Sequence, residues 1–437
     1  MKKGGFALLA LMGFLTIAIF LYLILSKRVS VIVALILVPI IFGLFTTDIK
    51  NLGTMILEGV SGVAPTGIML AFAILFFGLM SKAGLFDPVI SRVLKLVKGD
   101  PLKIVIGTAV IGMVTHLDGS GASTFLITIP ALLPLYERLG ISRLVLAGVV
   151  ALSAGVMNIV PWGGPTARAS SALGIDAAEL FNPLIPAMLA GVIWVLFVSY
   201  ILGKRERKRL GIQDFQYDFN QELSEEERKA RRPKLLWLNL LLTVITIVAL
   251  VKVWLPLPII FMVAFAIALV VNYPNPKDQQ ERITEQATGM VTVVSIIFAA
   301  GIFTGVLSGT GMIEAMAKSL VEIIPESTGS FMALIVAVTS MPLSLVFTPD
   351  AYYFGVLPVL SETANAYGIA PVNIGRAAIL GQMTTGFPLS PLTASTFLLI
   401  GLARVELGDH QRFIFLWAFG TTIVMSIIAF ITGAIAI

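Results

Sequence analysis

Two aspartates stand in strongly apolar surroundings and are the residues of this chain best suited to chemistry. Asp118 lies within THLDGSGASTF (Thr115–Phe125), and its apolar flanks, at about 11 residues each, fall short of the roughly 20 needed to cross a bilayer as a helix. Asp350 lies within TPDAYY (Thr348–Tyr353) in the second half of the chain. An ionisable side chain inside a membrane is energetically costly, which favours a functional role for both carboxylates.

The residues alone leave the roles of these groups open. Either aspartate could ligate a cation or carry a proton. Asp-Gly-Ser-Gly is equally good turn and cap chemistry, and the Thr-Pro-Asp sequence around Asp350 is a good helix start. His116 could be a satisfied buried histidine, or it could be a proton carrier or a neighbour of the ligand. We therefore assign Asp118, Asp350 and His116 to metal or proton coupling, with structural roles as the alternative.

Two long apolar segments are each interrupted once by proline and glycine. PWGGP (Pro161–Pro165) interrupts the first and FPLSP (Phe387–Pro391) the second. Such breaks stop the helical hydrogen-bond ladder. Matching breaks in two halves of a transporter indicate a midplane site, where the N-termini of half-helices suit an anion. Arg168, just after the first break, is a candidate for binding a carboxylate, although a snorkelling arginine is the alternative.

Hydroxyl and small residues gather at these interruptions. Serine and threonine commonly pack between membrane helices, so each is a weak signal alone, and their clustering carries the prediction. The candidate substrate-binding residues are Ser120, Ser123, Thr124, Asn158, Gly163, Gly164, Thr166, Arg168, Thr384, Thr385, Ser390 and Thr393.

Composition identifies the elements that must position these groups. Of the 437 residues, 57% are hydrophobic and 13% charged, whereas a soluble domain is about 25% charged, so we expect a polytopic membrane protein. There is no cysteine and there are two histidines, which argues against a zinc or iron–sulfur centre. The net charge of +5 comes from short loops and indicates topology-setting cations, not nucleic-acid binding. HExxH and GxSxG motifs are missing, so no enzyme is predicted.

The two halves of the chain resemble each other. Gly78–Val97 matches Gly305–Ile324, and Pro161–Gly174 matches Phe387–Gly401, at an offset of about 227 residues. The predicted fold is an all-α polytopic membrane protein of two inverted repeats, each with about five transmembrane helices, a re-entrant helical hairpin and a broken helix. The boundaries are residues 1–203 (hairpin 102–137, broken helix 143–174), a cytoplasmic linker 204–234, and residues 235–437 (hairpin 330–362, broken helix 373–403).

Loop charges predict the orientation. The linker and the short basic loops face the cytoplasm if both termini lie outside, in agreement with the positive-inside rule. The apolar stretch Phe6–Leu25 is then a retained first helix and not a signal peptide. Both flanks of the first hairpin become cytoplasmic, so it must re-enter from the inside, while the second enters from outside. The predicted location is the cell membrane, and specifically the inner membrane of a bacterium.

The stretches THLDGSGASTFLITIPALLPLYERLGI and NIVPWGGPTARAS resemble the citrate–metal:proton symporter family (CitMHS) of the ion transporter superfamily. The resemblance implies uptake of citrate as a complex with a divalent cation, Mg²⁺ or Ca²⁺, together with protons. It also implies a homodimer that works as an elevator. The divalent cation would be part of the substrate and no covalent cofactor is expected.

The chemistry agrees with a complexed substrate. Fully ionised citrate is a trianion that is expensive to desolvate, and a divalent cation leaves a net charge near −1 for one arginine and helix N-termini to balance. Asp118, Asp350 and the hydroxyls could complete the oxygen shell of such a cation. The alternatives are a proton-coupled transporter of another organic anion (a free di- or tricarboxylate, or gluconate) and a cation–proton antiporter, which would leave Arg168 without a role.

Overall fold

The structure is a computed structural model that describes residues 3–97, 99–212 and 229–436. Every regular element in these ranges is helical. Seven helices of the described part are long and apolar enough to cross a membrane, namely those within Phe6–Leu25, Ile49–Lys82, Pro101–Asp118, Ala177–Leu210, Pro233–Lys252, Pro276–Gly309 and Leu407–Ile431. The protein is thus an all-helical multi-pass membrane protein.

Two 34-residue helices, α3 (Ile49–Lys82) and α14 (Pro276–Gly309), form the longest helical pair of the molecule and lie side by side. Small residues permit this close packing: a Cβ atom on Gly59 would lie 2.1 Å from the carbonyl oxygen of Gly301. α2 (Val31–Gly43) packs against α14, and α13 (Leu257–Asn272) packs against α3. Outside them, α1 (Lys3–Leu25) packs against α2, and α12 (Leu236–Lys252) packs against α13.

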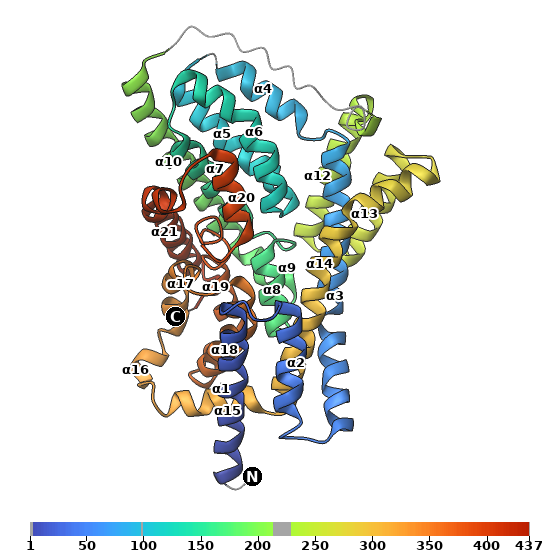
Figure 1. The fold of residues 1–437 in the computed structure, drawn as a ribbon, viewed down its shortest axis with the longest axis vertical. Coiled ribbons are helices and arrows are strands. Elements are labelled where there is room, and N and C mark those ends of the chain that lie inside the picture. Colours follow the sequence, from blue (N-terminus) through green and yellow to red (C-terminus); the bar gives the residue numbers. More distant parts are fainter. Residues whose placement is uncertain (1–2, 98, 213–228, 437) are drawn as a thin grey trace.

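A short helix follows each long one. α4 (Asp87–Val97) comes after α3, and α15 (Met312–Val321) comes after α14. Both carry charged residues along one face and apolar residues along the other, as helices at a membrane surface do. Figure 1 shows α4 at one end of the molecule and α15 at the opposite end, near the N-terminus.

Two helical hairpins supply the aspartates. In the first, α5 (Pro101–Thr115) leads through a 3₁₀ turn to α6 (Gly121–Leu139). Asp100 caps α5 by accepting a hydrogen bond from the N–H of Leu102, and Gly119 turns the chain in the left-handed region at φ +71°. In the second hairpin, α17 (Met332–Leu343) leads to the π-helical segment Ala351–Val356 and α18 (Leu357–Ala366).

The first broken helix consists of α7 (Arg143–Met157) and α8 (Gly164–Leu173). The second consists of α19 (Pro371–Ile379) and α20 (Ala394–Ala403). The sequence predicted that the helix before the second break continues to Gly386, and this is wrong, because α19 already ends at Ile379. The break covers residues 380–393 and is therefore more than twice as long as the first, which covers residues 158–163.

Side-chain contacts explain the early end of α19. The hydroxyl of Thr384 donates to the carbonyl of Ile379, and the side-chain amide of Asn158 donates to the carbonyl of Met383 over 2.6 Å. Met383 itself has a positive φ of 58°, which ends regular helix geometry. The side chains of Thr384 and Asn158 thus satisfy backbone carbonyls that a continuing helix would have paired internally.

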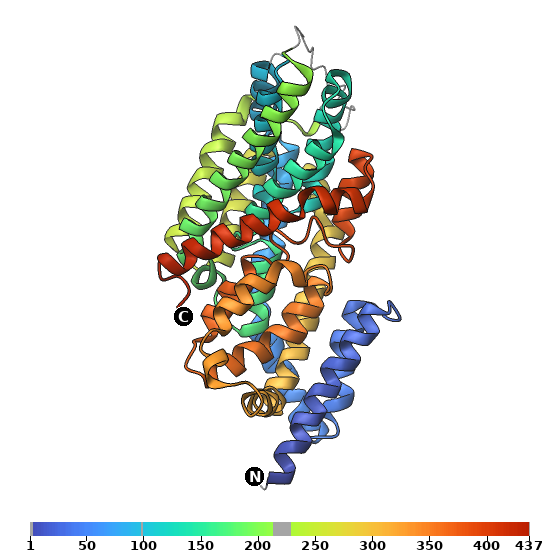
Figure 2. The same cartoon turned by 90° about the vertical axis from the view of Figure 1, so that its left-hand side faces the viewer.

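Two long helices complete the molecule. α10 (Ile185–Leu210) packs against α5 and α7, and α21 (Leu407–Ile431) packs against α10, α7 and α17. Figure 2 shows α21, in red, crossing the green α10. Short elements join these parts: α9 (Ala177–Phe181), η2 (Asn182–Leu184), η3 (Pro233–Leu235) and α16 (Glu326–Gly329).

Candidate functional site

An ion pair joins the two halves of the chain. Nε of Arg168, on α8, lies 2.7 Å from Oδ1 of Asp350, at the tip of the second hairpin, and the two side chains are only 13% and 12% exposed. The Thr348 hydroxyl accepts a hydrogen bond from the N–H of Ala351 over 3.2 Å, so Asp350 stands in the first turn of a capped helix. The structure therefore brings together two residues that the sequence selected separately, and the charge of Arg168 is neutralised in this conformation.

Asp118 braces the tip of the first hairpin. Its Oδ1 accepts a hydrogen bond of 2.8 Å from the N–H of Ser120, which closes an Asx turn around Gly119. The cap of α6 is Ser120, whose hydroxyl accepts from the N–H of Ser123 over 3.3 Å. Asp118 is thus a turn residue and not the helix cap.

A cavity of about 410 Å³ lies between the first hairpin and the long helices. Asp118 and Ser123 line it from the hairpin, and Lys82 lines it from the end of α3. Arg231 and Asp87 also line it and form an ion pair with each other. Within the residues that the structure describes, Lys82 has no carboxylate partner, so the wall of the cavity carries one unpaired cation as well as the Asp118 carboxylate.

Ser81 of α3 and Gln286 of α14 add further polar groups to the lining. Sequence reasoning missed Lys82 and Arg231, because it counted basic residues near helix ends only as topology signals. It also missed Gln286, an uncharged residue outside that count. A usable signal was present for Lys82, which lies in the stretch Gly78–Val97 that resembles the second half.

His116 is fully buried, and both of its ring nitrogens have partners. Nδ1 lies 2.8 Å from Oγ1 of Thr124, and Nε2 lies 3.3 Å from Oδ1 of Asn158. Since the amide nitrogen of Asn158 donates to the carbonyl of Met383, its oxygen faces the ring and accepts from Nε2, while the Thr124 hydroxyl beside Nδ1 also donates to the carbonyl of Ser120 over 2.9 Å. This arrangement favours the satisfied histidine, and it ties the first hairpin to both breaks.

The predicted hydroxyls hold the breaks together. Thr166 donates to the carbonyl of Ile159 over 2.6 Å, and Ser390 donates to the carbonyl of Ser344 over 2.5 Å. A hydroxyl whose hydrogen is committed to a carbonyl offers lone pairs to a further partner, which suits a cation better than an anion. The remaining members behave as follows: Thr384 donates to Ile379, Thr385 lies 2.5 Å from Thr422, and the buried Oγ1 of Thr393 has no partner among the described residues.

Gly163 and Gly164 allow close approach at the first break. A Cβ atom on Gly163 would lie 2.0 Å from the carbonyl oxygen of Asn158, and one on Gly164 would lie 2.5 Å from Cε of Met383. No side chain caps α8, whose N-cap is Gly163. Among the described residues, no side chain accepts a hydrogen bond from the N–H groups of this first turn, which lies close in sequence to Arg168.

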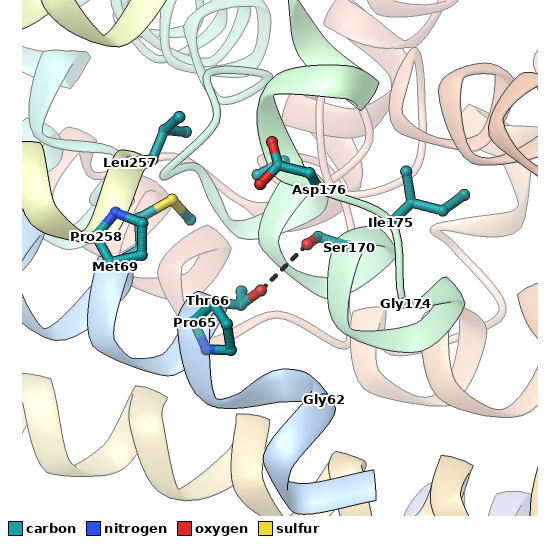
Figure 3. Close-up of a pocket in the computed structure, with 11 residues that line it drawn as sticks. Gly62, Pro65, Thr66, Met69, Ser170, Gly174, Ile175, Asp176, Leu257 and Pro258 are labelled. Carbon is teal, nitrogen blue, oxygen red and sulfur yellow. Dashed lines mark hydrogen bonds between the residues drawn. The ribbon is translucent and has the colours of Figure 1, made fainter. Parts of the chain in front are cut away.

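A second cavity, of about 200 Å³, lies between α3, α8 and the start of α13 (Figure 3). The hydroxyls of Thr66 and Ser170, which both line it, form a hydrogen bond of 3.1 Å with each other. None of the residues selected from the sequence lines it. Across the described residues, no three His, Cys, Asp or Glu side chains form a set able to hold a metal ion, and Asp118 and Asp350 have separate partners.

Comparisons with known proteins agree on one family. A family model described as "Citrate transporter" (CitMHS) matches residues 20–381. The "Citrate transporter" of Bacillus subtilis (strain 168) is 55% identical over 98% of this chain and 100% of its own length. The "Mg(2+)/citrate complex secondary transporter" of the same organism is 48% identical, again over 98% and 100% of the two chains.

Solved structures of low sequence identity share the fold. The Alcanivorax borkumensis YdaH transporter superposes with a TM-score of 0.64 at 13% identity, covering 96% of this chain and 98% of its own. Neisseria gonorrhoeae MtrF superposes with a TM-score of 0.55 at 14% identity, covering 87% and 83%. At such identities the likeness concerns the fold alone.

Proposed function

This chain belongs to the CitMHS family of citrate transporters, and from that premise we propose that it imports citrate complexed with Mg²⁺ or Ca²⁺ in symport with protons. It is a transporter and not an enzyme. The 48% identity to a transporter named for the Mg²⁺–citrate complex supports the metal-complexed substrate.

The observation that carries the proposal is the cavity of about 410 Å³ at the first hairpin. A metal–citrate complex presents a hard cation on one side and carboxylate oxygens on the other. Asp118 and Ser123 offer oxygen ligands to the cation, and Lys82 offers a positive charge to a carboxylate. The metal enters with the substrate in this scheme, so the protein need supply only part of its coordination shell.

Proton coupling is assigned to the pair of Arg168 and Asp350. As long as Asp350 is ionised, the 2.7 Å contact occupies Arg168. Protonation of Asp350 removes the opposite charge and frees the guanidinium beside the uncapped start of α8, where it can bind an anion. The proton and the anionic complex would then move together.

The order of the helices supports two inverted repeats. Each half has two helices, a 34-residue helix, a short amphipathic helix, a hairpin, a broken helix and a final long helix, in the same order. The short helices α4 and α15 lie at opposite ends of the molecule (Figure 1). We assign residues 1–203 and 235–437 to the two repeats, the hairpins to re-entrant elements, and both termini to the outside of the cell membrane. Elevator movement and a homodimer belong to the same proposal.

Uptake into proteoliposomes tests this function directly. Radiolabelled citrate should enter only with Mg²⁺ or Ca²⁺ present, should be driven by an inward proton gradient, and should stop when a chelator is added. Metal-independent uptake would show that the substrate is the free anion. Competition by gluconate or a free dicarboxylate that exceeds competition by the metal–citrate complex would identify another organic anion as the substrate.

A further inference from the structure

We propose that Lys82 and Gln286, on the two long helices, complete the substrate site and select the carboxylate that the metal ion leaves free. This inference rests on the proposed metal–citrate substrate. It adds to the first hairpin a second wall that comes from α3 and α14.

Lys82 is the unpaired cation of this cavity. Arg231, the other basic residue in the lining, is neutralised by Asp87, whereas Lys82 has no carboxylate partner in the part of the chain that the structure describes. Lys82 lies in the last turn of α3, where the helix dipole also favours a positive charge. The dipole accounts for a lysine at the helix end, but it leaves the charge free to bind an anion from the cavity.

The side-chain amide of Gln286 occupies the space that Gly78, which has no side chain, leaves free. A Cβ atom on Gly78 would lie 2.5 Å from Cδ of Gln286 and 2.6 Å from its Oε1, so the amide crosses α3 only because residue 78 has no side chain. No hydrogen-bond partner occupies the Gln286 amide among the described residues. It therefore presents both a donor and an acceptor beside Lys82.

The chemistry of the complex explains why two walls are needed. A divalent cation held by two carboxylates and the hydroxyl of citrate leaves the third carboxylate free. Asp118 and Ser123 face the cation side, and Lys82 and Gln286 provide a charge-assisted and a neutral hydrogen bond for the free carboxylate. A dicarboxylic hydroxy acid such as malate has no third carboxylate, so its metal complex gains nothing from Lys82.

Transport kinetics of Lys82→Gln test the charge. Loss of one charge-assisted hydrogen bond should raise the KM for Mg²⁺–citrate about tenfold or more. The maximal rate should stay within about twofold, and inhibition by Mg²⁺–malate should keep its wild-type value. Lys82→Arg should recover most of the affinity. Lys95→Gln, which removes an exposed lysine of α4 outside the cavity lining, is the matched control and should behave as wild type.

The role of Gly78 is tested by a mutant cycle. Gly78→Ala should displace the Gln286 amide, so it should raise the KM as much as Gln286→Ala does, and the double variant should be no worse than either single variant. Gln280→Ala, an exposed glutamine of the same helix, is the control. Thermal melting of each variant shows whether it is folded.

The two proposals fail in different ways. If the wild type takes up citrate without a metal ion, the proposed function itself is wrong. If the wild type transports Mg²⁺–citrate while Lys82→Gln keeps its KM within twofold, or loses affinity for the malate complex equally, the selection by Lys82 is wrong. Additive effects of Gly78→Ala and Gln286→Ala would contradict the placement of the amide.

Discussion

At the scale of single residues, Arg168 and Asp118 do not share a site. If both lay in one midplane site, they would have common neighbours, and among the described residues they do not. Arg168 is paired with Asp350, whereas Asp118 closes a turn and lines a separate cavity with Ser123. The two carboxylates therefore have different surroundings: Asp350 pairs with Arg168, and Asp118 lines the cavity at the first hairpin.

Asp118→Asn separates charge from turn geometry. Asparagine can still accept the hydrogen bond from the N–H of Ser120, so folding and expression should be preserved, while loss of the negative charge should abolish or uncouple metal–citrate transport. Asp48→Asn is the control, since Asp48 makes the same kind of contact with backbone N–H groups on an exposed helix end. Normal metal-dependent uptake by Asp118→Asn would reduce Asp118 to a turn residue.

Arg168→Ala should cost about 3 kcal/mol of stability, because it leaves the nearly buried Asp350 without its partner. Transport should also be lost. The double variant Arg168→Asp with Asp350→Arg should regain stability, since the pair is restored in reverse, but it should not regain transport, because the arginine no longer follows the start of α8. Thermal melting and proteoliposome uptake measure the two effects, and recovery of uptake in the reversed pair would contradict the proposed coupling.

At the scale of elements, the base of the first hairpin is fixed by the end of α10. Nε of Arg207 donates to Oδ1 of Asp100 over 2.8 Å, while Asp100 also caps α5. The carboxylate of Glu206 accepts from the N–H of Ser142 at 3.1 Å, just beyond the other end of the hairpin. These contacts hold both ends of the α5–α6 hairpin in place. The position of its tip at the cavity is therefore fixed by the anchored ends.

Acidification should weaken the contacts that hold the two ends of the α5–α6 hairpin. Burial raises the pKa of Asp100, but the hydrogen bonds from Arg207 and Leu102 and the charge of Arg207 outweigh it, so the pKa lies below the ordinary 3.8. A lowered folded-state pKa means that the stabilisation is complete above the unfolded value and is lost as the pH falls through the folded one. The melting temperature should therefore exceed that of Asp100→Asn at pH 7, and the difference should shrink below pH 3.8.

Arg207→Gln should lower the melting temperature at pH 7 in the same way, and the double variant with Asp100→Asn should add little, because both changes remove one interaction. A difference between wild type and Asp100→Asn that persists unchanged well below pH 3.8 would show that the pair does not contribute through its charge.

At the scale of the whole molecule, the absence of cysteine makes the proposed orientation directly testable. A single cysteine at the exposed Lys208, at the end of α10, should react with a membrane-impermeant thiol reagent only after the cells are opened. A cysteine at the exposed Ser327, in α16, should react in intact cells. The opposite pattern would invert the orientation, and labelling of both sites in intact cells would contradict the proposed topology.

The sequence by itself determined the class of protein and the positions of the irregular elements. Hydropathy and charge are local properties, and so are the cap, turn and break signals around Asp100, Gly119 and PWGGP, because each depends on neighbours within a few residues. In the structure, Gly119 turns the chain between α5 and α6, and α8 begins at Gly164, within PWGGP. The family motifs lie in these same segments, so sequence also indicated citrate transport.

Only the tertiary structure decided which of these groups meet. The pairing of Arg168 with Asp350 spans 182 positions of the chain, and the second break, which follows Ile379, receives a hydrogen bond at Met383 from Asn158 of the other half. Lys82 and Gln286 face the cavity of Asp118 because α3 and α14 pack through glycines. Contacts between distant segments depend on packing and mutual hydrogen-bond satisfaction, and local sequence patterns do not encode them.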